Sequence, residues 1–199
     1  MRIIAGKWRG RRLAAPPGEG TRPMLDRAKV VVFDWLGSRL AEPGSLPPIA
    51  VLDLFAGAGT LGLECLSRGA SWVCFVEKAA AAWRVLTGTV SHLGAQHECC
   101  IVRGDALTVR LPAPPEFQRY SLIFLDPPYR MTQRFSPANP VIQRIVGLGT
   151  EPYVAHDAFL LIRQDVRADR LLPLAGWRCV ERREIGTMAI TFLVRNEFS

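Results

Sequence analysis

The hydrophobic pattern of the chain changes near residue 49. Before that point, apolar residues are scattered among glycine, proline and arginine. After it, short continuous apolar runs alternate with stretches of helical periodicity. Residues 1–48 therefore predict an N-terminal extension, with a short hairpin within residues 1–23 and a helix over residues 27–41 capped by Asp26. Residues 49–199 predict one larger domain.

The apolar runs after residue 49 predict buried strands, and the segments between them predict helices. Strands are expected at residues 49–55, 71–76, 100–103, 122–125 and 158–163, and helices at 60–68, 79–93 and 140–148. Two further runs, 177–184 and 187–195, predict a closing antiparallel pair. Continuous apolar strands separated by helices indicate an α/β fold, with a doubly wound, mostly parallel sheet covered on both faces.

The composition excludes several classes of protein. The 199 residues are 49% hydrophobic and 22% charged, which is typical of a globular domain. No apolar run of about 18 residues predicts a membrane span, and basic residues interrupt the N-terminus before a signal core forms, so we expect a cytoplasmic protein. The five cysteines are odd in number and form no C-x-x-C pair, which disfavours a disulfide framework and a zinc site.

The positive charge is concentrated at the N-terminus. The chain carries a net charge of +7, and residues 1–29 hold eight basic and two acidic residues, a net +6. The remaining residues therefore contribute only +1. A localised basic segment is typical of a protein that binds a polyanion such as nucleic acid, although a solvated basic tail is the alternative interpretation.

Acidic residues mark the ends of the first three predicted strands, where ligands bind in open α/β sheets. Asp53 precedes the glycines Gly57 and Gly59, which allow a tight turn and a close ligand. Glu77, 20 residues after Gly57, can accept both hydroxyls of a ribose. Asp105 follows the third strand and can accept a hydrogen bond from an adenine amino group. Together they predict a nucleoside-binding edge.

The charge of Asp53 bears on which nucleoside binds. Residues 57–62 fit G-x-G-x-x-G, a pattern that suits NAD equally well. A carboxylate four residues earlier would repel a pyrophosphate and attract an ammonium group. S-adenosylmethionine has an ammonium and a sulfonium and no phosphate, so we predict it as the cofactor. A nicotinamide enzyme and a plain strand-to-helix turn are the weaker interpretations.

Two consecutive prolines follow an acidic residue in Asp126-Pro127-Pro128-Tyr129, after the fourth strand. The prolines stiffen the backbone and lack N–H donors, so the Asp126 carboxylate and the Asp126 and Pro127 carbonyls remain as acceptors. These acceptors can take both hydrogens of an exocyclic amine and free its lone pair. Tyr129 can stack on a flipped base, a contact worth about 1–3 kcal/mol. The motif predicts methyl transfer to a base amine, with a proline turn as the alternative.

These motifs resemble those of class I methyltransferases that modify exocyclic amines. The opening residues 1–13, with Thr21-Arg22-Pro23 and Asp26-Arg27, resemble the bacterial 16S ribosomal RNA guanine-N2 methyltransferase family (RsmD-type), and the resemblance covers nearly the whole chain. It implies a seven-stranded sheet with one antiparallel strand and a small N-terminal hairpin. The implied partner is 16S rRNA, within an assembled or assembling small ribosomal subunit, and we expect no membrane partner and a monomer.

The residues and the resemblance together give three sets of candidate site residues. The catalytic set is Asp126, Pro127, Pro128 and Tyr129. The cofactor set is Asp53, Phe55, Ala56, Gly57, Gly59, Glu77, Lys78, Asp105 and Ala106. The RNA-binding set is Arg2, Lys7, Arg9, Arg11, Arg12, Arg22 and Arg27. No metal site is expected.

The chain departs from the family pattern at three places. Met24-Leu25 stands where two threonines are usual, residues 28–33 lack a common glutamate, and Arg163-Gln164 stands where a glutamate is usual. The intact Asp-Pro-Pro-Tyr motif still predicts activity. Two other functions remain open: a DNA adenine-N6 methyltransferase, for which 199 residues leave little room for target recognition, and a catalytically silent rRNA-binding assembly factor.

Overall fold

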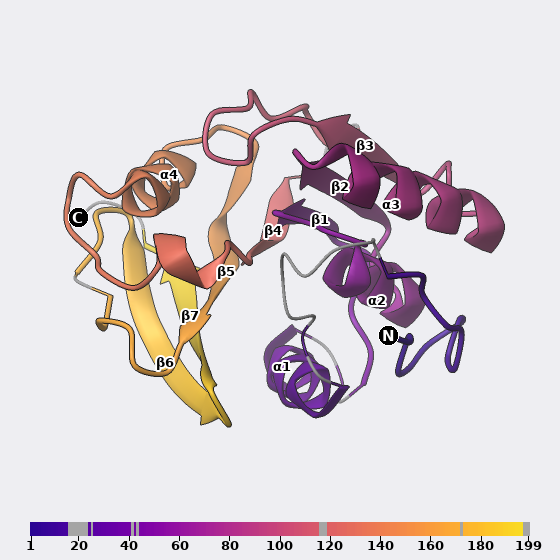
Figure 1. The fold of residues 1–199 in the computed structure, drawn as a ribbon, viewed down its shortest axis with the longest axis horizontal. Coiled ribbons are helices and arrows are strands. Elements are labelled where there is room, and N and C mark those ends of the chain that lie inside the picture. Colours follow the sequence, from indigo (N-terminus) through magenta and orange to yellow (C-terminus); the bar gives the residue numbers. More distant parts are fainter. Residues whose placement is uncertain are drawn as a thin grey trace.

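The computed structural model describes residues 1–15, 24, 26–40, 42, 44–115, 119–171 and 173–196, and shows one central sheet with helices on both faces (Figure 1). The helices are α1 (Asp26–Leu40), α2 (Thr60–Arg68), α3 (Ala80–Leu93), α4 (Pro140–Leu148) and the short 3-10 helix η1 (Tyr129–Met131). The strands are β1 (Ala50–Leu54), β2 (Trp72–Glu77), β3 (Cys99–Arg103), β4 (Tyr120–Leu125), β5 (Val154–Asp165), β6 (Trp177–Ile185) and β7 (Met188–Arg195). No helix in these described ranges is long and apolar enough to cross a membrane.

The seven strands lie in the order β3-β2-β1-β4-β5-β7-β6. Strands β1 to β5 pair in parallel, and β7 is antiparallel to both of its neighbours. The predicted doubly wound sheet of seven strands with one antiparallel member is therefore confirmed. Strand β5 begins four residues before its predicted start, because Val154 already pairs with Tyr120 and the polar His156 and Asp157 interrupt the apolar pattern before Ala158.

Two apolar cores lie on opposite faces of the sheet, because successive strand residues point to opposite sides. Helices α1, α2 and α3 cover one face, where Val51, Phe75 and Phe124 are buried. Helix α4 covers the other, where Leu52 and Ile123 are buried. Continuous burial of β1 on both faces explains its unbroken apolar sequence.

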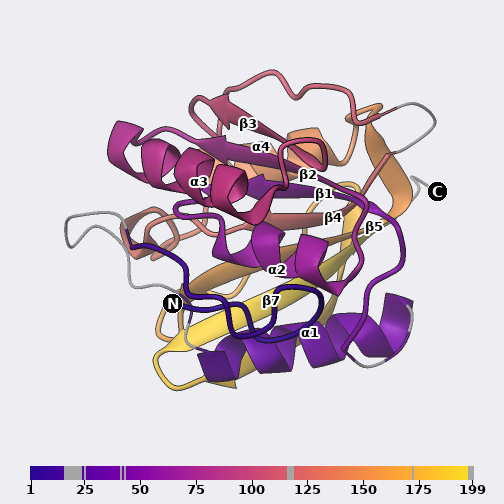
Figure 2. The same cartoon turned by 90° about the vertical axis from the view of Figure 1, so that its right-hand side faces the viewer.

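The N-terminal residues fold against the first of these faces. Residues 1–15 form a hairpin-like ladder, in which Ile3 N donates to Arg11 O at 3.0 Å and Leu13 N to Met1 O at 3.0 Å. Ile3 and Leu13 are buried in the same core as the sheet. Figure 2 shows this segment running beside α1 and α2.

Helix α1 packs across the β5–β7 end of the sheet. The Trp35 ring lies 4.0 Å from the Phe192 ring and meets Phe159 edge-on at 5.4 Å. The helix begins at Asp26, so the expectation that Asp26 caps the helix from outside was wrong by one position. The Asp26 carboxylate instead accepts a hydrogen bond from Arg2 Nε at 2.8 Å.

Candidate active site

The candidate site lies at the edge where β1, β2 and β4 end. Strand β1 is flanked by β2 and β4, so the sheet reverses its order there, and such a switch point opens a crevice for ligands. Leu54 is level with Val76 on β2 and with Leu125 on β4. The next residues of the three strands, Phe55, Glu77 and Asp126, therefore come together.

The loop after β1 takes a sequence of unusual backbone angles. Phe55 has φ 62°, and Gly57 and Gly59 have φ 57° and 74°. The left-handed region costs a non-glycine residue about 1–3 kcal/mol, and such strain gathers at ligand sites. A Cβ on Gly57 would meet no atom within 4 Å, whereas one on Gly59 would lie 2.4 Å from Leu86 Cδ1. Gly57 thus leaves open space beside the loop, and Gly59 permits packing on α3.

Glu77 joins this loop to the end of β2. Its Oε2 accepts from Gly57 N at 2.7 Å and its Oε1 accepts from Ala79 N at 2.6 Å. Each carboxylate oxygen can accept a further hydrogen bond. Glu77 can therefore contact ribose hydroxyls, as predicted, while keeping both of these backbone hydrogen bonds. Ala56, another predicted cofactor residue, is buried and donates from its N to Val76 O at 3.0 Å.

Asp53 lies beneath the loop rather than beside it. Its side chain is 1% exposed, and its Oδ2 accepts from Gly62 N, in the first turn of α2, at 3.0 Å. Burial, helped by the nearby charges of Asp126 and Glu77, raises the pKa of Asp53 to about 7, and the hydrogen bond from Gly62 N opposes that rise. Three carboxyl groups thus lie close together at the switch point, and a cationic ligand there would favour their ionised forms.

The end of β3 supplies Asp105, Ala106 and their neighbour Lys78. Lys78 Nζ lies 2.8 Å from Asp105 Oδ2, and Leu107 N donates to Asp105 Oδ1 at 3.0 Å. Both bonds lower the pKa of Asp105, the lysine more strongly. Ala106 is buried, so of these candidates Asp105 and Lys78 present polar atoms to solvent.

The Asp126–Tyr129 motif turns sharply away from β4. Asp126 N donates to Leu54 O at 3.3 Å, which extends the β1–β4 pairing by one bond. The two prolines follow, and Tyr129 begins η1, where Met131 N donates to Pro128 O at 2.9 Å. The half-buried Tyr129 packs against the α1–α3 core. The motif is therefore held beside the glycine loop by backbone bonds on both sides.

Comparison with known proteins gives consistent matches. A family model described as "Conserved hypothetical protein 95" matches residues 1–194. The Escherichia coli K12 protein "Ribosomal RNA small subunit methyltransferase D" is 34% identical over 190 residues, covering 95% of this chain and 87% of that one. A solved Escherichia coli structure, "Putative methyltransferase yhhF", superposes with a TM-score of 0.77 at 28% identity, covering 98% of both chains.

The chain belongs to the Conserved hypothetical protein 95 family. The predicted family resemblance and the class I methyltransferase fold are both confirmed. A shorter match, to "Ribosomal RNA small subunit methyltransferase D" of Haemophilus influenzae, is 36% identical over 129 residues and covers 65% of this chain and 64% of that one.

Arg163 contacts the side chain of Asp126 directly, and the sequence did not suggest this contact. Its Nε lies 2.5 Å from Asp126 Oδ1, and its guanidinium carbon lies 5.6 Å from the Tyr129 ring centroid. Burial raises the pKa of Asp126, and the Arg163 charge opposes that rise. The signal available in the sequence was an arginine and an aspartate at the ends of predicted neighbouring strands.

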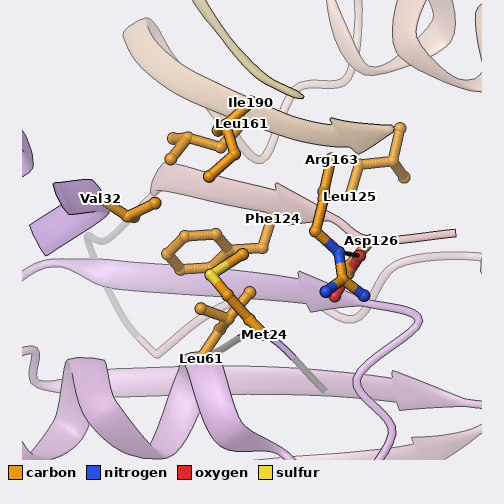
Figure 3. A pocket seen from close by; sticks show the side chains of 9 residues that line it. All are labelled: Met24, Val32, Leu61, Phe124, Leu125, Asp126, Leu161, Arg163 and Ile190. Carbon is orange, nitrogen blue, oxygen red and sulfur yellow. Dashed lines mark hydrogen bonds and ion pairs between the residues drawn. The ribbon is translucent and has the colours of Figure 1, made fainter. Parts of the chain in front are cut away.

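Arg163 and Asp126 border a small, mostly apolar cavity (Figure 3). Figure 3 shows the guanidinium turned toward Asp126, with the cavity lined by Met24, Val32, Leu61, Phe124, Leu125, Leu161 and Ile190. Met24 and Arg163, which both depart from the family pattern, therefore line the same cavity. Leu25 lies outside the described residues.

The predicted RNA-binding residues fall into two groups, those held in ion pairs and those exposed to solvent. Arg2 is paired with Asp26, and Lys7 lies 2.5 Å from Glu98 and 4.3 Å from the centre of the Trp8 ring. Exposed arginines form the rest of the described set: Arg9, Arg11, Arg12 and Arg27. Arg22 lies outside the described residues. The hairpin and the start of α1 thus present the excess positive charge.

Proposed function

We propose that the chain is an S-adenosylmethionine-dependent rRNA methyltransferase that modifies the exocyclic N2 of a guanine in 16S rRNA of the small ribosomal subunit. The observation that carries this proposal is the adjacency of two motifs. The glycine loop bonded to Glu77 and the Asp126–Tyr129 arch lie at the ends of the paired strands β1 and β4. The 34% identity to a protein named ribosomal RNA small subunit methyltransferase D supports the choice of RNA.

The residues around the loop fit S-adenosylmethionine. Gly57 leaves open space, Glu77 can accept hydroxyls, and the clustered carboxylates suit a ligand with two positive charges and no phosphate. Asp105 can accept from the adenine amino group. When bound, the cofactor supplies an electrophilic methyl group on its sulfonium.

The arch after β4 can orient and activate the base. The Asp126 and Pro127 carbonyls, with the Asp126 carboxylate, accept the two amine hydrogens and direct the nitrogen lone pair toward the methyl group. Tyr129 stacks on the base and excludes water. Arg163 fixes the Asp126 carboxylate from the side, so only part of its accepting capacity remains for the amine.

A labelled-methyl assay tests the proposal. Small subunits from a strain lacking the modification, naked 16S rRNA and naked DNA are each incubated with the chain and labelled S-adenosylmethionine. We expect label only in RNA, recovered as N2-methylguanosine by mass spectrometry. Asp126→Ala should lower the rate at least about 100-fold, an effect of the size typical for a positioned catalytic group. The exposed acid Asp34 supplies the matched control, and Asp34→Ala should retain the rate.

Other results of the labelled-methyl assay would point to one of the two alternative functions. Label on adenine N6 in DNA would establish a DNA methyltransferase. Tight RNA binding without any transfer, unaffected by Asp126→Ala, would establish a silent assembly factor. Either result contradicts the proposed reaction.

A further inference from the structure

A second hollow lies between α1 and the turn that joins β6 to β7. Both ribbon views place this turn beside α1 (Figures 1 and 2). The hollow has a volume of about 440 Å³. This volume is within the range of pockets that bind a small ligand or one part of a larger ligand. We call it the α1–β7 groove, and its lining residues are Arg27, Val31, Arg183, Glu184, Ile185 and Gly186.

Positive charge predominates around the α1–β7 groove. The exposed Arg27 comes from the first turn of α1, and Arg183, with 40% of its side chain exposed, faces it from β6. Glu184, the one acid of the lining, forms an ion pair with Arg182. The lining thus holds two arginines and one acid, and that acid is paired with an arginine outside the lining.

Glu181 holds Arg183 in place at the groove. Its Oε1 accepts from Arg183 Nε at 2.5 Å, and its Oε2 accepts from Trp35 Nε1 at 2.6 Å and from Arg39 at 3.4 Å. Two arginines thus share one carboxylate, which leaves a net positive charge. The indole anchors that carboxylate to α1, so the two walls of the groove are tied together. Arg183 is therefore positioned before any ligand arrives.

The groove opens at the same edge of the sheet as the candidate active site. Met188, the first residue of β7, is level with Asp165 at the carboxyl end of β5, and the β6–β7 turn ends there. On α1, Val31 lines the groove, and the next residue, Val32, lines the small apolar cavity beside Asp126. Strand β5 lies between β4 and β7 in the sheet, so an RNA strand that enters the Asp126–Tyr129 arch can extend to this turn.

We propose that the α1–β7 groove binds the sugar–phosphate backbone of the substrate RNA next to the target nucleotide, with Arg27 and Arg183 contacting phosphates. This inference rests on the proposed function and specifies the path of its substrate. Arg183 and the turn lie in the C-terminal part of the chain, far in sequence from the basic N-terminus. RNA binding is thereby shared between the two ends of the sequence.

Salt-dependent RNA binding tests the groove. The affinity of the full chain for 16S rRNA and for small subunits is measured from low to moderate salt, for wild type and for Arg27→Ala, Arg183→Ala and the double variant. Each phosphate contact to single-stranded RNA contributes about 0.7 to the slope of log K against log salt. We expect each single change to reduce the slope by about 0.7 and the double change by about 1.4.

Two controls isolate the groove. Arg178→Ala removes an exposed arginine from the other end of β6 and should leave the slope unchanged. The double variant Arg27→Lys, Arg183→Lys keeps both charges and should retain the slope. Affinity for S-adenosylmethionine without RNA, and thermal melting, report whether the alanine variants remain folded.

The outcomes separate this inference from the proposed function. A wild-type chain that methylates the subunit, together with unchanged slopes in both alanine variants, would overturn the groove alone. Loss of affinity for subunits without loss for naked RNA would assign the groove to a protein component and would also overturn it. If the expected slopes appear but no methyl is transferred, the groove stands and the proposed reaction fails.

Discussion

Arg163 controls the electrostatics of the aspartate that begins the Asp-Pro-Pro-Tyr motif. Asp126 has 18% of its side chain exposed, so burial favours its neutral form. The guanidinium 2.5 Å away favours the ionised form. The protonation of Asp126 thus depends on an arginine from the neighbouring strand.

Replacing this arginine should shift the pH dependence of methyl transfer. In Arg163→Met the cation is lost, the pKa of Asp126 rises, and the acid limb of the pH–rate profile moves to higher pH. The measurement is the methyl-transfer rate against pH for both proteins. Arg167→Met, an exposed arginine just beyond β5, serves as the control. Coincident profiles for Arg163→Met and wild type would show that Arg163 does not govern this ionisation.

The buried Asp53 should make the protein less stable as pH rises. The pKa of Asp53 is about 7 in the folded chain, well above the ordinary value of 3.8 that applies when unfolded. The folded state therefore binds more protons between about pH 4 and pH 7, and stability falls across that window. Each pKa unit corresponds to about 1.4 kcal/mol, so the loss amounts to a few kcal/mol.

Asp53→Asn should remove that loss, since the amide oxygen can still accept from Gly62 N. The free energy of unfolding is measured with denaturant at pH 5 and pH 8 for both proteins. The stability of the variant relative to wild type should be greater at pH 8 than at pH 5. The exposed Asp34→Asn should show no such difference. An equal effect at both pH values would contradict the raised pKa.

At the scale of elements, helix α2 holds the N-terminal hairpin through one buried acid. Glu64 is fully buried, and its two oxygens accept from Ile4 N at 2.9 Å and Ala5 N at 3.0 Å. Arg68 Nε lies 2.9 Å from Glu64 Oε1, and Lys29 Nζ lies 3.6 Å from Oε2. One carboxylate thus joins the hairpin, α1 and α2.

Glu64→Gln should release the hairpin. The amide has one acceptor oxygen, so one backbone N–H loses its partner, Arg68 loses its counter-charge, and Lys29 keeps only Asp26, 3.9 Å away. Breaking such a buried pair costs about 3–5 kcal/mol. Hydrogen exchange at the Ile4 and Ala5 amides should accelerate, and trypsin should cleave after Lys7 or Arg9 sooner.

The matched control for that change is Glu98→Gln. Glu98 also contacts the hairpin, through Lys7, but the pair is about one-third to one-half exposed, and such pairs are worth about 0–1 kcal/mol. Similar destabilisation by both variants would show that Glu64 is not the principal attachment.

The elements of this chain were predictable where one physical rule dominates. Continuous apolar runs located the inner strands β1 and β4, because two-sided burial demands them. The start of β5 was missed, since the polar, exposed His156 and Asp157 interrupt the apolar pattern between Val154 and Ala158. The roles of Glu64 and Arg163 were missed as well, because each depends on partners far away in the sequence. No local pattern encodes such contacts.

At the scale of the whole molecule, folding redistributes the charge that the sequence concentrates at one end. Arg2 and Lys7 are in ion pairs, and Lys29 is 1% exposed, with burial lowering its pKa. The N-terminal bases therefore contribute less to the surface than their number indicates. Arg183, from the opposite end of the chain, adds charge to the edge that carries the candidate site.

The attachment of the hairpin to Glu64 also has a thermodynamic consequence. A disordered N-terminal segment that folds only when it binds its ligand loses backbone entropy during binding. Such binding shows the large negative heat-capacity change of coupled folding. The backbone of Ile4 and Ala5 is already ordered by α2, so its conformational entropy was spent when the chain folded. Calorimetry of RNA binding through the hairpin should therefore show the small heat-capacity change expected when two already folded surfaces associate.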